Sequence, residues 1–450
     1  MASALDFTYR YTSPSELTSI HSGKPNLFLA TSSPNDTNPF FFDGRVKSPR
    51  VMGDMLIALS DIVRTHYFLP MPVLLDPVLT SNTNLLRVEG FSGCCGVYAR
   101  ADFPAQAFEG NHMGNGTTNV DFNAPMRNAL MRLRDDEDVQ FSVGKSEVVL
   151  GKGEESFIEK KVKLPLRWIK GFSEVQAYQA QLQLITEVNA ANALRFFRTL
   201  PKSSKPKMPS YVISSGQSLR LSQRPQHGAV KILGTHRLKA IEPLFARAKK
   251  LRVWANPDNG TSAWQVCFEQ GTFFMMISPE VYRGFSGEGQ ILSSLTAPPA
   301  ENVIAKVRAQ LKWQTQIDSQ QLARDLSLSE SDVIASLTVL GSKGLAGFDV
   351  TQNCYFHREL PFDLSTVEDM QPRLKGARKL IDEGLIKLIS ESESSDIIYE
   401  VAGTGTRHRV TLSNSGDQCT CPWFNKHRGD RGPCKHVLAA QLFNNNRNEK

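Results

Sequence analysis

The sequence lacks any apolar segment that could cross a membrane, because no run approaches the roughly 18 consecutive apolar residues that a spanning helix needs. Its first residues, MASALDFTYRYTSP, contain no basic segment followed by an apolar run, so they do not read as a secretion signal. We therefore expect a cytoplasmic protein that neither enters nor crosses a membrane.

Cysteine is scarce and poorly placed for disulfide bonds. The chain has seven cysteines, and three of them lie close together near the C-terminus. The other four are Cys94, Cys95, Cys267 and Cys354, and the first two are adjacent. This arrangement makes a poor disulfide framework, which also favours the cytoplasm.

Strong charge and nucleotide-binding loops are missing as well. The formal net charge of +7 is mild for 450 residues, and a solvated surface explains it as well as a polyanionic ligand does. The glycine-rich segment 284–289 (GFSGEG) has neither the Lys-Ser/Thr of a phosphate loop nor a following dinucleotide-type helix. We interpret it as a turn, and the chain lacks ATPase motifs of its own.

Metal-binding side chains are concentrated in residues 418–443, QCTCPWFNKHRGDRGPCKHVLAAQLF. Cys419 and Cys421 share one face of a strand and can hold one ion together. Cys434 is expected just before a helix, with His436 in its first turn, since residues two apart diverge on a helix. The pattern predicts strand, loop and helix around one structural zinc ion with a closed Cys3His ligand set.

Two alternatives to this zinc site remain open at the sequence level. The three cysteines could form a redox or disulfide group, and His427 could replace His436 as the fourth ligand. The pattern Cys-x-Cys, variable loop, Cys-x-His resembles the SWIM zinc finger family over residues 397–443. That resemblance implies a ββα zinc fold that binds DNA or proteins.

Basic residues outnumber acidic ones in the same segment. Six basic residues stand against three acidic ones between residues 397 and 443, and three thiolates with one zinc ion leave about +2. Arg407 and Arg409 alternate on the expected strand, and Arg428 and Arg431 lie in the loop between the ligand pairs. We predict that these four arginines form one patch that binds acidic protein or nucleic acid.

The first part of the chain is predicted to be an α+β region. Apolar residues recur at helical spacing in segment 49–66, and segment 85–103 alternates like two strands. Helices expected at 124–133, 190–200 and 236–249 are each followed by a hairpin pattern. This order loosely resembles the repeated lobes of sliding clamps, but no clamp sequence motif is present, and a plain α+β domain is the interpretation that we favour.

The pair Cys94-Cys95, between Gly93 and Gly96, is the one enzyme-like feature of the sequence. An exposed cysteine between glycines could act as a nucleophile, whereas a free cysteine is more often a small buried apolar residue. No base is recognisably paired with either thiol. A cysteine-dependent enzyme that uses Cys94 or Cys95 is the alternative to a non-enzymatic protein.

Residues 300–363 follow the order helix, helix, helix, hairpin, which resembles a winged helix. Ser329 is expected to cap the third helix, and Val333, Leu337 and Leu340 to face inward. Its outward residues would be Ser331, Ala335, Ser336, Thr338 and Ser342, with Lys343 at its end. Because this helix carries no arginine, the pattern favours protein docking or a purely architectural role.

These segments add up to an α+β multidomain protein. The predicted parts are an α+β region (1–297, with a break near 201–209), a winged-helix-like domain (300–363), a helix over 374–389 with an acidic serine-rich hinge (364–396), and the finger (397–443). Taken together, they resemble bacterial SWIM zinc finger proteins of this length. The resemblance implies a zinc adaptor associated with MoxR-type AAA+ ATPases and von Willebrand A domain proteins.

Overall fold

The computed structural model describes residues 16–20, 24–28, 40–68, 77–153, 155–162, 164–201, 208–257, 259–287, 289–360, 371–391 and 396–448. No helix in these ranges is long and apolar enough to span a membrane. Strands β1 (Glu16–Ile20) and β2 (Lys24–Phe28) form a separate antiparallel pair. The predicted loop 201–209 and hinge 390–396 lie partly outside the described residues.

An eight-stranded antiparallel sheet is the centre of the body, which we define as residues 40–290. Its strands, in spatial order, are β12 (Gln183–Asn189), β16 (Lys250–Ala255), β17 (Ser262–Cys267), β18 (Thr272–Ile277), β6 (Val97–Pro104), β5 (Leu85–Phe91), β4 (Val78–Ser81) and β8 (Gly116–Asn119). All residues of β17 are buried, and β18 reads TFFMMI, so both faces of the sheet are covered.

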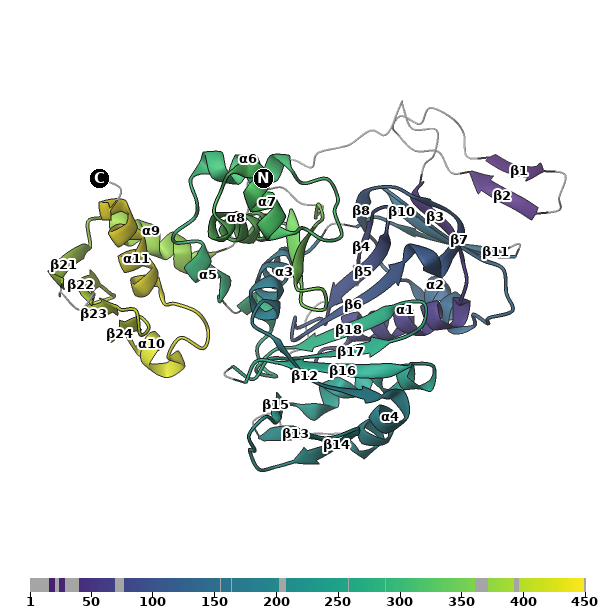
Figure 1. The fold of residues 1–450 in the computed structure, drawn as a ribbon, viewed down its shortest axis with the longest axis horizontal. Helices are drawn as coiled ribbons and strands as arrows, with labels where there is room; N and C mark the ends of the chain where they lie inside the picture. Colours follow the sequence, from purple (N-terminus) through teal and green to yellow (C-terminus); the bar gives the residue numbers. More distant parts are fainter. Residues whose placement is uncertain are drawn as a thin grey trace.

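Helices lie on opposite faces of this sheet (Figure 1). Helix α1 (Pro49–Arg64) packs on β5 and β6, where Gly90 lies against Val63. Helix α3 (Leu166–Gln179) covers the other face, and its Trp168 and Phe172 rings meet Phe91 at 5.6 and 5.0 Å. Gly90 has no side chain, which leaves room for both Val63 of α1 and Trp168 of α3, whereas the Phe91 ring packs on α3.

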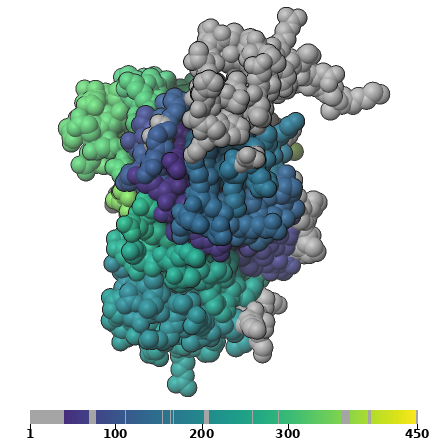
Figure 2. All heavy atoms as spheres, turned by 90° about the vertical axis from the view of Figure 1, so that its right-hand side faces the viewer, coloured from purple at the N-terminus to yellow at the C-terminus, as the bar shows by residue number. Residues whose placement is uncertain are grey.

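Two smaller sheets complete the body. The five-stranded sheet has the order β11 (Glu155–Lys160), β10 (Glu147–Lys152), β9 (Val139–Gly144), β3 (Phe40–Val46) and β7 (Phe108–Met113), with η1 (Ala105–Ala107) before β7 and α2 (Ala124–Met131) nearby. The three-stranded sheet has the order β14 (Ser218–Ser222), β13 (Pro209–Ser215) and β15 (Val230–Leu233), packed by α4 (Ala190–Thr199). In Figure 2 the blue part that holds β9 to β11 lies above the teal part that holds β13 to β15.

The helix expected over residues 236–249 is wrong in type. The structure forms 3-10 turns from Thr235 to Ala246 (η2), with Pro243 inside them. Proline lacks the backbone N–H that an α-helix would use at this position, so a continuous α-helix is disfavoured. The helices predicted at 49–66, 124–133 and 190–200 are present, as are the two strands around Cys94-Cys95.

Residues 301–360, which we call the middle module, form three helices and a hairpin. They are α6 (Glu301–Ala309), α7 (Ser319–Leu326), α8 (Glu330–Ser342), β19 (Ala346–Asp349) and β20 (Cys354–His357). As predicted, the Ser329 side chain caps α8 by accepting the Asp332 N–H at 3.0 Å. Val333, Leu337 and Leu340 are buried, also as predicted.

The outer face expected for α8 needs correction. Ser336 and Ser342 are buried rather than exposed, because α8 packs on α3 of the body. The helices approach so closely that a Cβ at Gly341 would lie 1.8 Å from the Gln176 side chain. The buried face of α8 is therefore wider than its apolar pattern indicated.

A buried ion-pair network joins the middle module to the central sheet. Asp349 accepts from Arg87 at 2.7 Å and from Arg100 at 2.9 Å, and both arginines also bind Asp102. Burial alone would raise the pKa of Asp349, but the two guanidinium groups hold it well below its usual range. The module also shares one apolar core with the body, so the two form one packed unit.

The C-terminal lobe, residues 371–448, has a core of its own. Its antiparallel sheet has the order β21 (Ile386–Glu391), β22 (Ile397–Ala402), β23 (Arg407–Leu412) and β24 (Gln418–Cys419). The helices are α9 (Pro372–Asp382), α10 (Pro422–His427) and α11 (Lys435–Asn448), and Figure 1 shows the lobe at one end of the molecule. Short helix α5 (Ile291–Ser294) lies between lobe and body, and its Leu292 belongs to the lobe's core.

The helix predicted over 374–389 is too long. It ends at Asp382, where Gly384 adopts φ +66° and Leu385 donates its N–H to the Leu380 carbonyl. The following apolar residues form β21, which pairs with β22. The predicted hinge 390–396 thus joins neighbouring strands of one sheet, and the lobe begins before it.

Candidate metal centre

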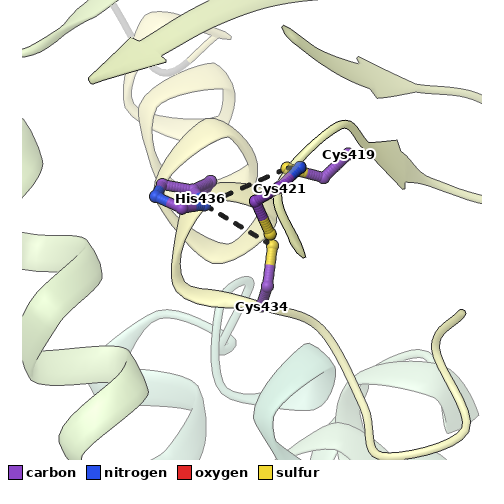
Figure 3. Close-up of side chains that lie close together, drawn as sticks. All are labelled: Cys419, Cys421, Cys434 and His436. Carbon is purple, nitrogen blue, oxygen red and sulfur yellow. Dashed lines mark hydrogen bonds between the residues drawn. The ribbon is translucent and has the colours of Figure 1, made fainter. Parts of the chain in front are cut away.

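The four predicted zinc ligands come from the ends of short elements. Cys419 ends β24, Cys421 is the N-cap of α10, Cys434 precedes α11, and His436 lies in the first turn of α11. Their ligand atoms all lie within 4.8 Å of one another, and all four residues are buried. Figure 3 shows the three sulfur atoms and the His436 ring facing a common point.

The segment between the ligand pairs is not only a loop. Residues Pro422–His427 form α10, which begins with proline at its first position, where no helical N–H is needed. Cys421 is consequently a helix cap rather than a strand residue. Its sulfur accepts the Phe424 N–H at 3.3 Å, a bond that orients the sulfur toward the site.

Backbone N–H groups support the other sulfur atoms as well. Cys419 Sγ accepts from the Cys421 N–H and Cys434 Sγ from the Val437 N–H, both at 3.4 Å. The close approach of the Cys419 and Cys434 sulfurs raises the pKa of Cys419 and lowers that of Cys434. The sulfurs thus converge in a place where a cation can take up thiolate charge.

His436, and not His427, is the histidine that lies beside the three cysteines. His436 Nδ1 lies 4.0 Å from both Cys419 Sγ and Cys434 Sγ, whereas the His427 ring lies 4.9 Å from the Trp423 ring, tilted to it, and is not in the cluster. All three cysteines are free thiols that converge with an imidazole. Three sulfurs and one nitrogen are a donor set that suits tetrahedral zinc, so the residues fit the ion.

Aromatic side chains of the finger belong mainly to its core. Trp423 and Phe424 are half-buried and pack against the apolar cluster of the lobe. The Arg373 guanidinium lies 4.9 Å from the Trp423 ring centre. Trp423 therefore joins α10 to α9 by packing and a cation–π contact.

Of the four predicted arginines, Arg409 and Arg428 line one open groove of about 650 Å³, together with Thr420 and Asn425. Arg407, two residues before Arg409 on β23, is exposed and paired with Glu400 at 2.6 Å. Arg431 instead reaches the Gly287 carbonyl of the body at 2.6 Å.

The charged residues that line the groove are two arginines and one aspartate. Asp417 is its one acidic lining residue, and its carboxylate accepts from the Ser413 N–H at 3.2 Å and the Gln441 amide at 2.6 Å. The groove thus presents two guanidinium groups beside polar donors. Sequence reasoning missed Thr420 and Asn425, because single polar residues in a loop carry no distinguishing signal.

The cysteine pair offers little for catalysis. Cys95 is fully buried with φ +54°, and burial raises the pKa of its thiol to about 12. Cys94 is half-buried, and its sulfur lies 3.6 Å from the Ser92 hydroxyl. The geometry therefore does not favour the cysteine-enzyme alternative.

Comparison with known proteins agrees with the metal centre. Residues 408–442 match the SWIM zinc finger family. No curated protein matches the chain. Among solved structures, the chain is similar to the proliferating cellular nuclear antigen of Entamoeba histolytica, with 9% identity, a TM-score of 0.38, and coverage of 54% of this chain and 99% of that one. A likeness of this size does not establish a shared fold.

Proposed function

Starting from a SWIM zinc finger at residues 408–442, we propose that this chain is a non-enzymatic zinc adaptor that binds protein or nucleic acid through the finger. The observation that carries the proposal is the closed Cys3His cluster next to the groove of Arg409 and Arg428. Cys419 itself lines that groove, so the metal site and the proposed binding surface share a wall.

A structural role for the metal follows from the ligand count. Four protein ligands fill a tetrahedral zinc ion and leave no position for water or substrate. The ion would hold β24, α10 and α11 together in a lobe whose core is small. The finger can then present its groove without taking part in chemistry.

The groove suits an anionic partner. Arginine forms paired hydrogen bonds with carboxylate or phosphate, and Thr420 and Asn425 add neutral polar groups. Arg407 adds a third guanidinium on the same face of β23, although Glu400 offsets its charge. Both an acidic protein segment and a nucleic-acid backbone match this chemistry.

We assign the middle module an architectural role as a winged-helix-like domain. Helix α8 carries no arginine, and most of its C-terminal half is buried against the body. The resemblance to bacterial SWIM finger proteins extends the proposal to a cytoplasmic assembly with a MoxR-type ATPase and a von Willebrand A domain protein. We likewise propose that residues 1–297 contain helix-and-hairpin repeats.

The double variant Arg409→Ala/Arg428→Ala tests the groove. Binding of a duplex oligonucleotide and of an acidic peptide would be measured by fluorescence anisotropy over a range of salt concentrations, with zinc content checked. If the partner is duplex DNA, the slope of log K against log salt should fall by about 2, because about one counterion is released per phosphate contact. Arg134→Ala/Arg220→Ala, which removes two exposed arginines of the body, is the matched control. Unchanged binding of both probes by the groove variant would contradict the proposal.

A further inference from the structure

The segment just before Cys434 touches the body rather than solvent. We call residues 428–433 the latch loop. Arg431 donates to the Gly287 carbonyl at 2.6 Å, and the Asp430 carbonyl accepts from the Gln290 side chain at 2.9 Å. Gly432, at φ +72°, lies so close to the body that a Cβ there would be 1.9 Å from the Gly289 carbonyl oxygen. The latch loop thus fits closely against Gly287, Gly289 and Gln290.

Both sides of this contact are fixed within their own part of the molecule. On the body side, the Gln290 N–H donates at 2.8 Å to Glu174, a residue of α3 that is 2% exposed. On the lobe side, Arg373 of α9 donates to the carbonyls of Arg431 and Pro433 at 2.8 and 3.0 Å. The contact therefore links α3 of the body to α9 of the lobe.

A second contact lies on the other side of α5. The Thr296 hydroxyl is 3.2 Å from the Gln441 amide oxygen, and the Asn445 amide donates to the Thr296 carbonyl at 3.0 Å. Gln441 and Asn445 lie on α11, the helix that follows the zinc ligands Cys434 and His436. We call these two contacts together the seam. On the lobe side, both are made by segments that the metal site positions.

The metal ligands hold both ends of the segment that contains the latch loop. Residues 422–433 lie between Cys421 and Cys434, and Gly429 and Gly432 have φ values of +86° and +72°. Glycines in this conformation give the free segment high conformational entropy. An ion shared by Cys421 and Cys434 would close the segment into a loop and reduce that entropy before docking.

We propose that zinc occupancy controls the docking of the C-terminal lobe on the body through the latch loop. With zinc bound, Asp430, Arg431 and Gly432 keep the positions that fit Gly287, Gly289 and Gln290. Without zinc, Cys434 is released and the seam opens, while the body keeps its own core. By linkage, docking must also raise the affinity for zinc by the factor by which zinc favours docking. The proposal concerns the seam and holds whichever partner the groove takes.

Hydrogen exchange of the full-length chain, read by mass spectrometry over residues 284–296, tests this directly. This segment contains no metal ligand and is distant in sequence from the finger. Removing zinc with a chelator should speed its exchange about tenfold or more, because the Gln290 N–H loses its fixed surroundings. Peptides from β17 and β18 should be unaffected. Unchanged exchange over 284–296, in a sample whose finger peptides have lost protection, would overturn the proposal.

Two variants approach the seam from opposite sides. Arg431→Ala acts from the lobe, and Gln290→Ala removes the donor to the Asp430 carbonyl without changing any residue of the finger. Both should speed exchange over 284–296 at unit zinc content and weaken zinc binding several-fold in a chelator competition. Lys426→Ala, an exposed residue of α10, is the control and should change neither quantity. If both variants open the seam but zinc affinity stays constant, zinc and docking are not coupled and the proposal is wrong.

Discussion

The middle module and the C-terminal lobe are both attached to the body, but by different chemistry. The module shares the body's apolar core and is joined to it by buried ion pairs, such as Arg87 with Asp349 and Arg358 with Glu89. The lobe has a separate core, which takes in Leu292 of the linking helix α5, and it also makes hydrogen bonds to backbone carbonyls, including those of Gly287 and Thr296. The middle module cannot separate from the body without exposing the main apolar core. The lobe can separate from the body without exposing that core.

The difference shows where each part of the molecule obtains its stability. A buried charge network is costly to break because removal of one partner strands the others in a medium that solvates them poorly. A small lobe has too little apolar surface to fold strongly alone, so it depends on its metal. Loss of zinc should thus act on the lobe, and loss of an ion pair on the body.

The largest effect is expected for the zinc ligand variant Cys421→Ser. It removes one of four ligands, so zinc content should fall well below one per chain and the lobe should unfold. Limited proteolysis should then cut residues 371–448 while the body and middle module remain intact. Undiminished zinc would rule out the ligand assignment. Cuts spread evenly along the chain would show that the lobe does not unfold separately from the body and the middle module.

The second effect is expected for Asp349→Ala in the buried network. Arg87 and Arg100 would lose the carboxylate that joins them to the middle module, which should cost about 3–5 kcal/mol in the free energy of unfolding. Urea denaturation would measure it, with Asp136→Ala, an exposed carboxylate, as the control. Zinc content should not change, and a stability close to that of the parent protein would show that the network contributes little.

Acid should lower the free energy of unfolding by protonating His357, a residue of the middle module. Burial lowers the pKa of this histidine to about 4, and its Nδ1 accepts the Trp313 N–H at 2.8 Å. The folded state therefore favours the neutral ring, and the associated stability is present above about pH 6.5 and lost as pH falls toward 4. The loss should be on the order of 2 kcal/mol.

The variant His357→Gln separates this contribution from the others, since glutamine keeps an acceptor but does not titrate. Its unfolding free energy should vary less between pH 7 and 4.5 than that of the parent. Asp349 and Glu89, whose pKa values are held down by neighbouring arginines, lose their contribution only as pH falls below their ordinary range. An equal pH dependence for variant and parent would contradict the role of His357.

The smallest effect concerns the cap of α8. Ser329→Ala removes the side-chain acceptor for the Asp332 N–H and should cost about 1 kcal/mol. Because the middle module shares the body's core, this loss should lower the main unfolding transition and leave the lobe unaffected. Ser218→Ala, an exposed serine of β14, is the control. A change confined to the lobe would contradict the shared core.

Sequence reasoning succeeded where the determining residues are close together. The zinc ligands span only residues 419–436, and each lies at or beside the end of a short strand or helix. The Ser329 cap and the inward face of α8 follow from patterns within one turn or one helix. Such short-range relations survive in a single sequence because no distant partner is needed to define them.

It failed where a partner lies far away in the chain. The contact of Arg431 with the Gly287 carbonyl and the covering of Ser342 by another helix both involve residues far away in the chain. The buried network left a signal that was not used: charged Arg87, Glu89, Arg100 and Asp102 alternate within otherwise apolar strands. Charges on a covered face of a sheet require charged partners, although the sequence does not say which ones.

The most direct test of the account is the metal content and coordination of the purified protein, measured by elemental analysis and X-ray absorption. We predict one zinc ion per chain with three sulfur ligands at about 2.3 Å and one nitrogen ligand at about 2.0 Å. The nitrogen should be lost in His436→Ala and retained in His427→Ala. Absence of zinc at unit stoichiometry, or a coordination shell unchanged by His436→Ala, would contradict the central claim.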